Sequence, residues 1–130
     1  MRHIHLLPIL AATAALAGPF DQPYAIITTD TKPAADHLLR PVIVNRVDGE
    51  NAMDHRAVVA PGLRKVTVDL PPRKGFHTAT QHTFDLEVKP CVRYHVAAKL
   101  ASTTTQSWKP VIRSEERIVE CESKFKVAGK

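Results

Sequence analysis

Prolines recur along this chain and leave few windows in which a long helix could form. Ten of the 130 residues are proline, and nine of these lie after residue 17. A proline inside a helix removes a backbone donor and clashes with the preceding turn. We therefore expect the chain after residue 17 to consist mainly of strands and turns.

Between the prolines, apolar and polar residues alternate, which is the period of a strand with one buried face. The clearest case is 63–70, where Val66, Val68 and Leu70 share a face. Further candidate strands are 24–29, 41–47, 57–60, 84–88, 92–100 and 108–113. Seven or eight short strands separated by turns predict an all-β fold, an antiparallel β-sandwich formed by a single domain over 18–130.

Two dipeptides mark tight turns. Asp48-Gly49 suits the positive φ angles of a tight turn, and in Pro61-Gly62 proline fixes φ at the first turn position while glycine takes the left-handed second. A single helical turn fits within 31–39. The segment 114–126 has two interpretations. It is either a capped helix or a turn at 114–116 followed by a short strand over 117–121, and the strand is favoured because a β-domain offers it a place to pair.

The first 17 residues have the three regions of a secretory signal peptide. Arg2 gives a positive start, 6–16 form an uncharged apolar run, and the small-residue triplet Ala15-Leu16-Ala17 places the cut between Ala17 and Gly18. The apolar run is much shorter than the roughly 20 residues of a membrane-spanning helix. No cysteine lies near the cut to accept a lipid. We expect a periplasmic or secreted protein with no stable membrane anchor.

Cys91 and Cys121 are the two cysteines of the chain. In an oxidising compartment an even, minimal count predicts one disulfide bond. Neither cysteine belongs to a C-x-x-C pair, which argues against a redox role. A bond that closes a loop of about 30 residues is worth roughly 3.5 kcal/mol, which is a large share of the stability of a small domain.

The charge of the chain does not indicate a nucleic-acid partner. Removal of Arg2 with the signal lowers the net charge from +5 to +4, and the remaining basic residues are spread along the sequence without interleaved aromatics. We therefore expect no nucleic-acid binding. A weak affinity for an anionic polymer remains compatible with this charge.

No catalytic motif stands out, so we expect a protein that is not an enzyme and that has no catalytic residue, metal site or cofactor. The serines lack an elbow motif such as G-x-S-x-G. The histidines after residue 17 are His37, His55, His77, His82 and His95. A metal site needs converging ligands. His82, Asp85 and His95 would meet only if 82–88 and 92–101 paired as a hairpin, and Asp85 and His95 would then face outward.

The polar loops 48–56, 71–82 and 102–107 are the natural places for a binding edge. Weak candidates for binding residues are Arg73, Lys74, His77, His82 and Trp108. Trp108 and Tyr94 would suit a sugar platform, although core packing is the more ordinary role for them. The leading hypothesis is a non-catalytic envelope module that binds a polymer or a protein. The alternatives are a small secreted enzyme inhibitor and a periplasmic metal-binding or hydrolytic protein that uses surface histidines.

One stretch of the sequence carries a family resemblance. A strand over 42–49 ends in Val-Asp-Gly, and 58–68 follows with a Pro-Gly turn and an alternating strand. With 84–88 and 93–96, this pattern resembles the PEGA-like and transthyretin-like β-sandwich modules in small periplasmic proteins of proteobacteria, over roughly 42–113. The resemblance implies a fold and no catalytic residues. The chain departs from it at Pro90-Cys91, where such modules more often turn with glycine.

Overall fold

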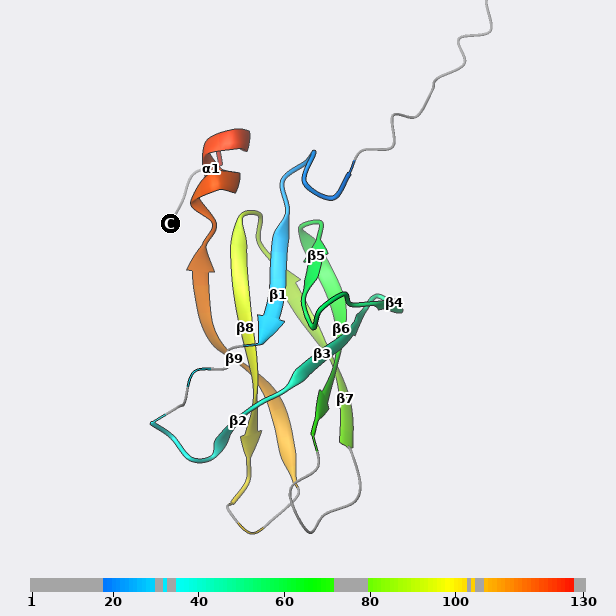
Figure 1. The fold of residues 1–130 in the computed structure, drawn as a ribbon, viewed down its shortest axis with the longest axis vertical. Helices are drawn as coiled ribbons and strands as arrows, with labels where there is room; N and C mark the ends of the chain where they lie inside the picture. The colour runs from blue at the N-terminus through cyan, green and yellow to red at the C-terminus, as the bar shows by residue number, and fades with distance from the viewer. Residues whose placement is uncertain are drawn as a thin grey trace, which may run out of the picture.

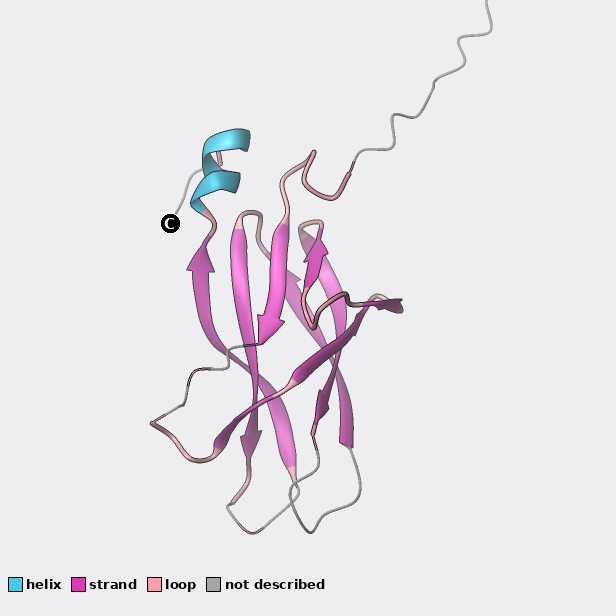
Figure 2. Cartoon of the chain, in the orientation of Figure 1, coloured by secondary structure: helices cyan, strands magenta, loops and turns pink. Residues whose placement is uncertain are grey.

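The structure is a computed structural model, and it describes residues 18–29, 32, 35–71, 80–102, 104 and 107–127. The elements are β1 (Ala25–Thr29), β2 (Leu39–Pro41), β3 (Ile43–Val47), β4 (Glu50–Asn51), β5 (Ala57–Val59), β6 (Gly62–Leu70), β7 (Thr80–Val88), β8 (Val92–Leu100), β9 (Trp108–Arg117) and α1 (Val119–Phe125). Strands dominate (Figures 1 and 2), which confirms the all-β class. The predicted signal 1–17, including Ala17, lies outside the described residues.

The strands form two sheets. In one sheet the order is β5–β1–β8–β9. Strand β2 also pairs with β8, on the same edge as β1 and next to it along β8. In the other sheet the order is β4–β3–β6–β7. Among the described strands the pairs are antiparallel, as expected, with the exception of β1 and β8, which pair in parallel. These two strands are far apart in sequence, so no tight turn forces an antiparallel arrangement.

Both sheets contribute side chains to one apolar core. Val66 and Val68 of β6 and Val96 of β8 are fully buried, and Ile27 of β1 packs with them. Leu70 and Leu100 belong to the same cluster. The alternation over 63–70 and 92–100 therefore predicts the buried faces of β6 and β8 correctly.

The corner between β7 and β8 is held by Tyr94 and Cys91. The Tyr94 hydroxyl accepts a hydrogen bond from the Lys89 backbone N–H at 2.8 Å, which resembles the tyrosine corner of two-sheet proteins. Burial raises the pKa of Tyr94. Cys91 has a φ of 60°, a region that glycine adopts more easily. Its backbone N–H donates to Tyr24 O at 2.6 Å and its carbonyl accepts from Ile118 N at 2.9 Å, so the strained residue is fixed on both sides.

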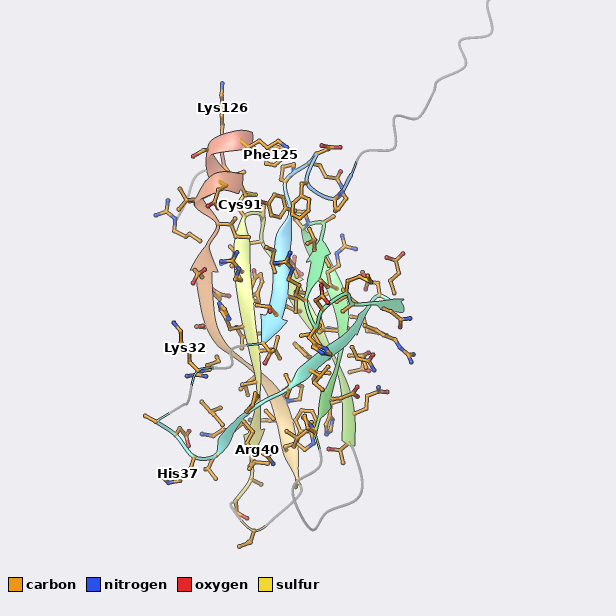
Figure 3. The ribbon with its side chains drawn as sticks, viewed as in Figure 1. Lys32, His37, Arg40, Cys91, Phe125 and Lys126 are labelled. Carbon is orange, nitrogen blue, oxygen red and sulfur yellow. A yellow bond between two sulfur atoms is a disulfide. The ribbon has the colours of Figure 1, made fainter. Side chains whose placement is uncertain are left out.

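The predicted disulfide is present, with Cys91 and Cys121 Cα atoms 5.3 Å apart. It anchors α1 at one end of the two sheets, beside the segment that precedes β1 (Figures 1 and 3). A second apolar cluster surrounds the bond and includes Tyr24, Ile26 and Ile118. The described residues contain no helix that is long and apolar enough to cross a membrane.

The favoured interpretation of the C-terminal segment is wrong. Residues 114–116 belong to β9, which pairs with β8, and the chain then forms α1 rather than a strand over 117–121. Cys121 and Phe125 pack into the second cluster from one face of α1, and this burial decides in favour of a helix. The helical turn predicted within 31–39 lies partly outside the described residues, because 31, 33 and 34 are not described; the described part has a single turn at 36–39, where Leu39 N donates to Asp36 O at 3.1 Å. The positive φ angles at Asp48 and Gly49 confirm the first turn prediction. At the second dipeptide the chain bends at Pro61, and Gly62, with a φ of 124°, begins β6 rather than taking the predicted left-handed turn position.

Candidate functional site

A groove lies between β5 and the β3–β4 hairpin, where the edges of the two sheets meet. It consists of two open pockets of ≈ 330 Å³ and ≈ 350 Å³ that share Val47, Glu50, Val58 and Val59. The first pocket is also lined by Pro19, Phe20, Asn51, Ala52, Met53, Asp54, Arg56 and Ala57, and the second by Asp48, Ala60 and Arg64. The groove therefore includes most of the predicted polar loop 48–56.

Strand β5 has one unpaired edge in this groove. It pairs with β1 over three residues, and no described strand pairs with its other side. All three β5 residues line the first pocket. An edge strand presents backbone donors and acceptors to which another extended chain can add.

Two exposed apolar side chains flank the edge of β5. Phe20 is 44% exposed and Met53 is 78% exposed, and both line the first pocket. Single exposed apolar residues are common on protein surfaces. These two share one pocket with an open strand edge, and that combination distinguishes this surface.

Met53 begins a tight turn over 53–56. The Arg56 N–H donates to Met53 O at 3.1 Å, and Asp54 and His55 have φ angles of 53° and 59°. Positive φ at both central residues is the geometry of a type I′ turn, which usually contains glycine. This turn was not among those predicted from the sequence. Aspartate and histidine adopt left-handed backbone more readily than most residues, so the Asp54-His55 pair was the sequence feature that could have indicated the turn.

Arg64 braces the second pocket. Its guanidinium donates to Ala60 O at 2.9 Å and Pro61 O at 3.0 Å, and it pairs with the Asp48 carboxylate at 3.1 Å. The other Asp48 oxygen accepts a hydrogen bond from the Lys65 backbone N–H at 2.8 Å. The Lys65 hydrogen bond, followed by that of Arg64, lowers the pKa of Asp48.

Between pH 7 and acidic pH, Asp48→Asn is expected to lose less stability than the wild type. The pKa of Asp48 is lower in the folded state than in the unfolded chain, so the ionised carboxylate stabilises the fold at pH values above the unfolded pKa of about 3.9. This stabilisation is lost as the pH falls through the folded pKa. Asparagine tolerates the positive φ and keeps one acceptor oxygen for the Lys65 N–H, so the change removes the charge and the hydrogen bond from Arg64. Because the pair is exposed, the expected loss at pH 7 is below ~1 kcal/mol.

Urea unfolding at pH 7 and near pH 2 measures this effect. The difference between Asp48→Asn and the wild type should be present at pH 7 and vanish near pH 2. Asp85→Asn, at an exposed position on β7, is the control. A difference of equal size at both pH values would show that the charge of Asp48 has no part in it.

The structure brings together two of the five candidate binding residues. The rings of His82 and Trp108 pack edge to face with their centroids 4.3 Å apart, and Trp108 Nε1 donates to Thr80 Oγ1. Trp108 is 6% exposed and Tyr94 is 1% exposed, so both pack in the core and form no exposed sugar platform. Arg73, Lys74 and His77 lie outside the described residues.

The hairpin that would have gathered His82, Asp85 and His95 does not form. Strand β7 pairs with β6, whereas β8 pairs in the other sheet with β9, β1 and β2. The β7–β8 corner carries the chain from one sheet to the other, so consecutive strands do not pair. Across the described ranges, no three histidine, cysteine, aspartate or glutamate side chains gather to hold a metal ion.

The chain matches no protein-family model, no curated protein and no solved structure. The resemblance to PEGA-like and transthyretin-like modules therefore stays an expectation, and any function has to be inferred from the groove itself.

Proposed function

We propose that residues 18–130 form an exported, non-catalytic β-sandwich module that binds a protein partner through the groove. An extended segment of the partner adds alongside β5, and its apolar side chains contact Phe20 and Met53. The observation that carries this proposal is the unpaired edge of β5 beside two exposed apolar side chains in one pocket.

The charge of the groove favours a protein over an anionic polymer. Glu50 and Asp54 line the groove, are exposed and have no ion-pair partner among the described residues. Arg56 also lines the groove and places one positive charge beside these two negative ones. An anionic polymer would meet these carboxylates. Elsewhere, Arg93 pairs with Glu116 and Lys99 with Asp36, which reduces the basic character of the β8 face.

Further basic residues lie on another side of the molecule. Lys32 and His37 lie between β1 and β2 and Arg40 lies in β2, on the side of the sheets away from β4 (Figure 3). They do not line the groove pockets. The groove is therefore suited to a segment that alternates apolar residues with occasional basic ones.

The buried disulfide supports the exported part of the proposal. Cys91 is 1% exposed and Cys121 is 0% exposed. Structural disulfides form and persist in oxidising compartments, such as the periplasm or the extracellular space. This agrees with a leader that is removed between Ala17 and Gly18.

One observation favours a second role, the inhibition of an enzyme. All four residues of the 53–56 turn are exposed, and the turn is closed by its own hydrogen bond. A rigid exposed turn of this kind suits insertion into the cleft of a partner enzyme. In this role the groove and the turn would contact the same partner.

Site-specific photo-cross-linking in the native host tests the protein-binding proposal. A photoreactive residue replaces Met53 in one form of the full chain and Val119 in another. Val119 is a matched control because it is also apolar and 62% exposed, and it lies on α1 and does not line the groove. We expect a discrete protein adduct from position 53 and none from position 119.

The cross-linked segment, identified by mass spectrometry, is then made as a synthetic peptide. Its affinity for the purified chain should fall roughly tenfold in Met53→Ser, through loss of ~1.4 kcal/mol of apolar contact, and stay unchanged in Val119→Ser. Equal adducts at both positions, or none at position 53, would contradict the proposal. An adduct that proves to be an enzyme inhibited by the chain would support the second role.

A further inference from the structure

The segment before β1 begins with a closed turn at the predicted cleavage point. Gly18 N donates to Asp21 Oδ2 at 2.7 Å, and Asp21 N donates back to Gly18 O at 3.0 Å. Pro19 occupies the second position of this turn, where its fixed φ is favourable. A Cβ on residue 18 would lie 3.3 Å from Asp21 Oδ2, so glycine fits this position with the least crowding.

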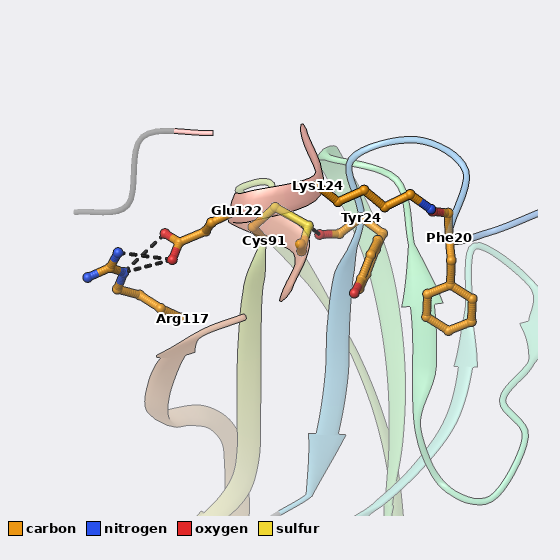
Figure 4. The surroundings of a disulfide bond; sticks show 7 residues. Phe20, Tyr24, Cys91, Arg117, Glu122 and Lys124 are labelled. Carbon is orange, nitrogen blue, oxygen red and sulfur yellow. Dashed lines mark hydrogen bonds and ion pairs between the residues drawn. A yellow bond between two sulfur atoms is a disulfide. The ribbon is translucent and has the colours of Figure 1, made fainter. Parts of the chain in front are cut away.

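This turn positions a wall of the groove. Its third residue, Phe20, lines the groove and packs edge to face on Tyr24, with ring centroids 5.0 Å apart. Lys124 Nζ of α1 donates to Phe20 O at 2.8 Å (Figure 4). Phe125 packs on the Tyr24 ring at 6.4 Å. The disulfide-anchored helix thus supports the turn from one side, and the Gly18–Asp21 contact closes it on the other.

We propose that removal of residues 1–17 places an α-ammonium group on the Asp21 carboxylate and so fixes Phe20 as a wall of the groove. Water hydrolyses the Ala17–Gly18 peptide bond, which leaves a carboxylate on Ala17 and an amine on Gly18. This amine takes up a proton at neutral pH, since α-amino groups have a pKa of about 7.7 to 8.0. A neutral amide-to-carboxylate hydrogen bond thereby becomes a charge-assisted one, which is stronger.

The charges around Gly18 agree with this assignment. The Asp21 carboxylate is the anion in contact with the Gly18 nitrogen, whereas the Lys124 ammonium of α1 binds the Phe20 carbonyl. The inference rests on the proposed export of the chain. It extends that proposal, because export and completion of the groove would follow from the same cleavage.

The first test is the N-terminal sequence of the exported protein. The full chain is produced in an exporting bacterial host, purified from the periplasm or the medium, and sequenced from its N-terminus. We expect Gly18 to be the first residue. A first residue other than Gly18 would overturn the inference.

The second test measures the ion pair in the mature protein. Asp21→Asn keeps a hydrogen-bond acceptor and removes the charge, and Asp85→Asn is the control at an exposed aspartate of β7. By NMR titration, the pKa of the Gly18 α-amino group should lie above the ordinary range in the wild type and in the control, and fall into it in Asp21→Asn. At neutral pH, hydrogen-exchange protection of the residue 21 amide should fall roughly two- to five-fold in Asp21→Asn, the effect of one exposed ion pair.

The third test concerns the groove wall and needs no partner protein. A form that retains Ala17 should show a weaker nuclear Overhauser effect between the Phe20 and Tyr24 rings than the form that begins at Gly18. Equal ring contacts in the two forms, or an α-amino pKa unchanged by Asp21→Asn, would overturn the inference. If these results hold and position 53 gives no adduct, the proposed partner binding fails while the assignment of the mature terminus stands.

Discussion

Replacing Cys91 and Cys121 together with alanine is expected to lower the free energy of unfolding by about 3–4 kcal/mol. The disulfide joins residues that are 30 apart in sequence, and cross-linking a loop of this length restricts the unfolded chain by roughly 3.5 kcal/mol. Both cysteines are buried, so small cavities add to the loss. A domain of this size has a total stability of about 5–15 kcal/mol, and its melting temperature should fall by about 10–20 °C.

The expected loss extends beyond loop entropy because α1 depends on the bond. Cys121 and Ile118 attach α1 to the cluster around Tyr24, and a helix of seven residues is too short to be stable alone. Hydrogen exchange should therefore show α1 opening first in the double variant. The Phe20 segment should follow, since Lys124 of α1 holds its carbonyl.

Guanidinium unfolding followed by circular dichroism measures the effect, with the wild type compared in oxidised and reduced forms. Val119→Ser is the matched control, because it changes an exposed residue of α1 and should shift stability by less than ~0.5 kcal/mol. A loss below ~1 kcal/mol in the double variant would mean that packing of α1 holds this end of the domain without the covalent bond.

The sequence predicts the strands well where one face of each is buried. Alternation over 63–70, 84–88 and 92–100 corresponds to β6, β7 and β8 with the expected inward residues. Alternation identifies the buried face of a strand and leaves open which strands are its neighbours. Alternation therefore could not predict that β1 pairs in parallel with β8, or that β7 and β8 belong to different sheets.

The C-terminal segment shows a different kind of failure. Ile118 and Cys121 fit a short strand as well as a helix, because so few apolar residues cannot distinguish the two periods. Tertiary contacts decide between them: the bond to Cys91 and the cluster around Tyr24 favour a helix. The disulfide itself could be predicted because the chain has two cysteines and therefore a single possible pairing.

The groove was the least predictable feature. The loop 48–56 was a candidate binding edge, but Phe20 and Met53 carried no signal of their own in the sequence. Phe20 lies close to the predicted cleavage point, and Met53 lies between Ala52 and Asp54, outside any alternating segment. They become notable only because the edges of two sheets place them in one pocket with β5. The binding candidate Trp108 belongs instead to the core.

Trp108→Ala is expected to lower the free energy of unfolding by about 3–5 kcal/mol, the range for truncating a buried aromatic side chain. The indole is 6% exposed and packs in the core shared by both sheets. It also joins β9 to β7 of the other sheet, through the His82 ring and the hydrogen bond to Thr80. Its loss should therefore weaken the contact between the sheets as well as leave a cavity.

Two milder variants separate the contributions. Trp108→Phe keeps an aromatic ring and removes the bond to Thr80, which is worth about 0.5–1.5 kcal/mol. His82→Ala removes the edge-to-face contact, also worth about 0.5–1.5 kcal/mol. Because Trp108 is the single tryptophan, unfolding must be followed by far-ultraviolet circular dichroism rather than by its fluorescence.

Met53→Ala is the matched control for these variants, because Met53 is a large apolar residue that is 78% exposed. Its truncation should leave stability within ~0.5 kcal/mol of the wild type. A loss below ~1 kcal/mol for Trp108→Ala would contradict the core assignment and would return Trp108 to the role of an exposed platform. The expected contrast has a physical cause: truncating Trp108 removes contacts made on folding, whereas Met53 is exposed to solvent before and after folding.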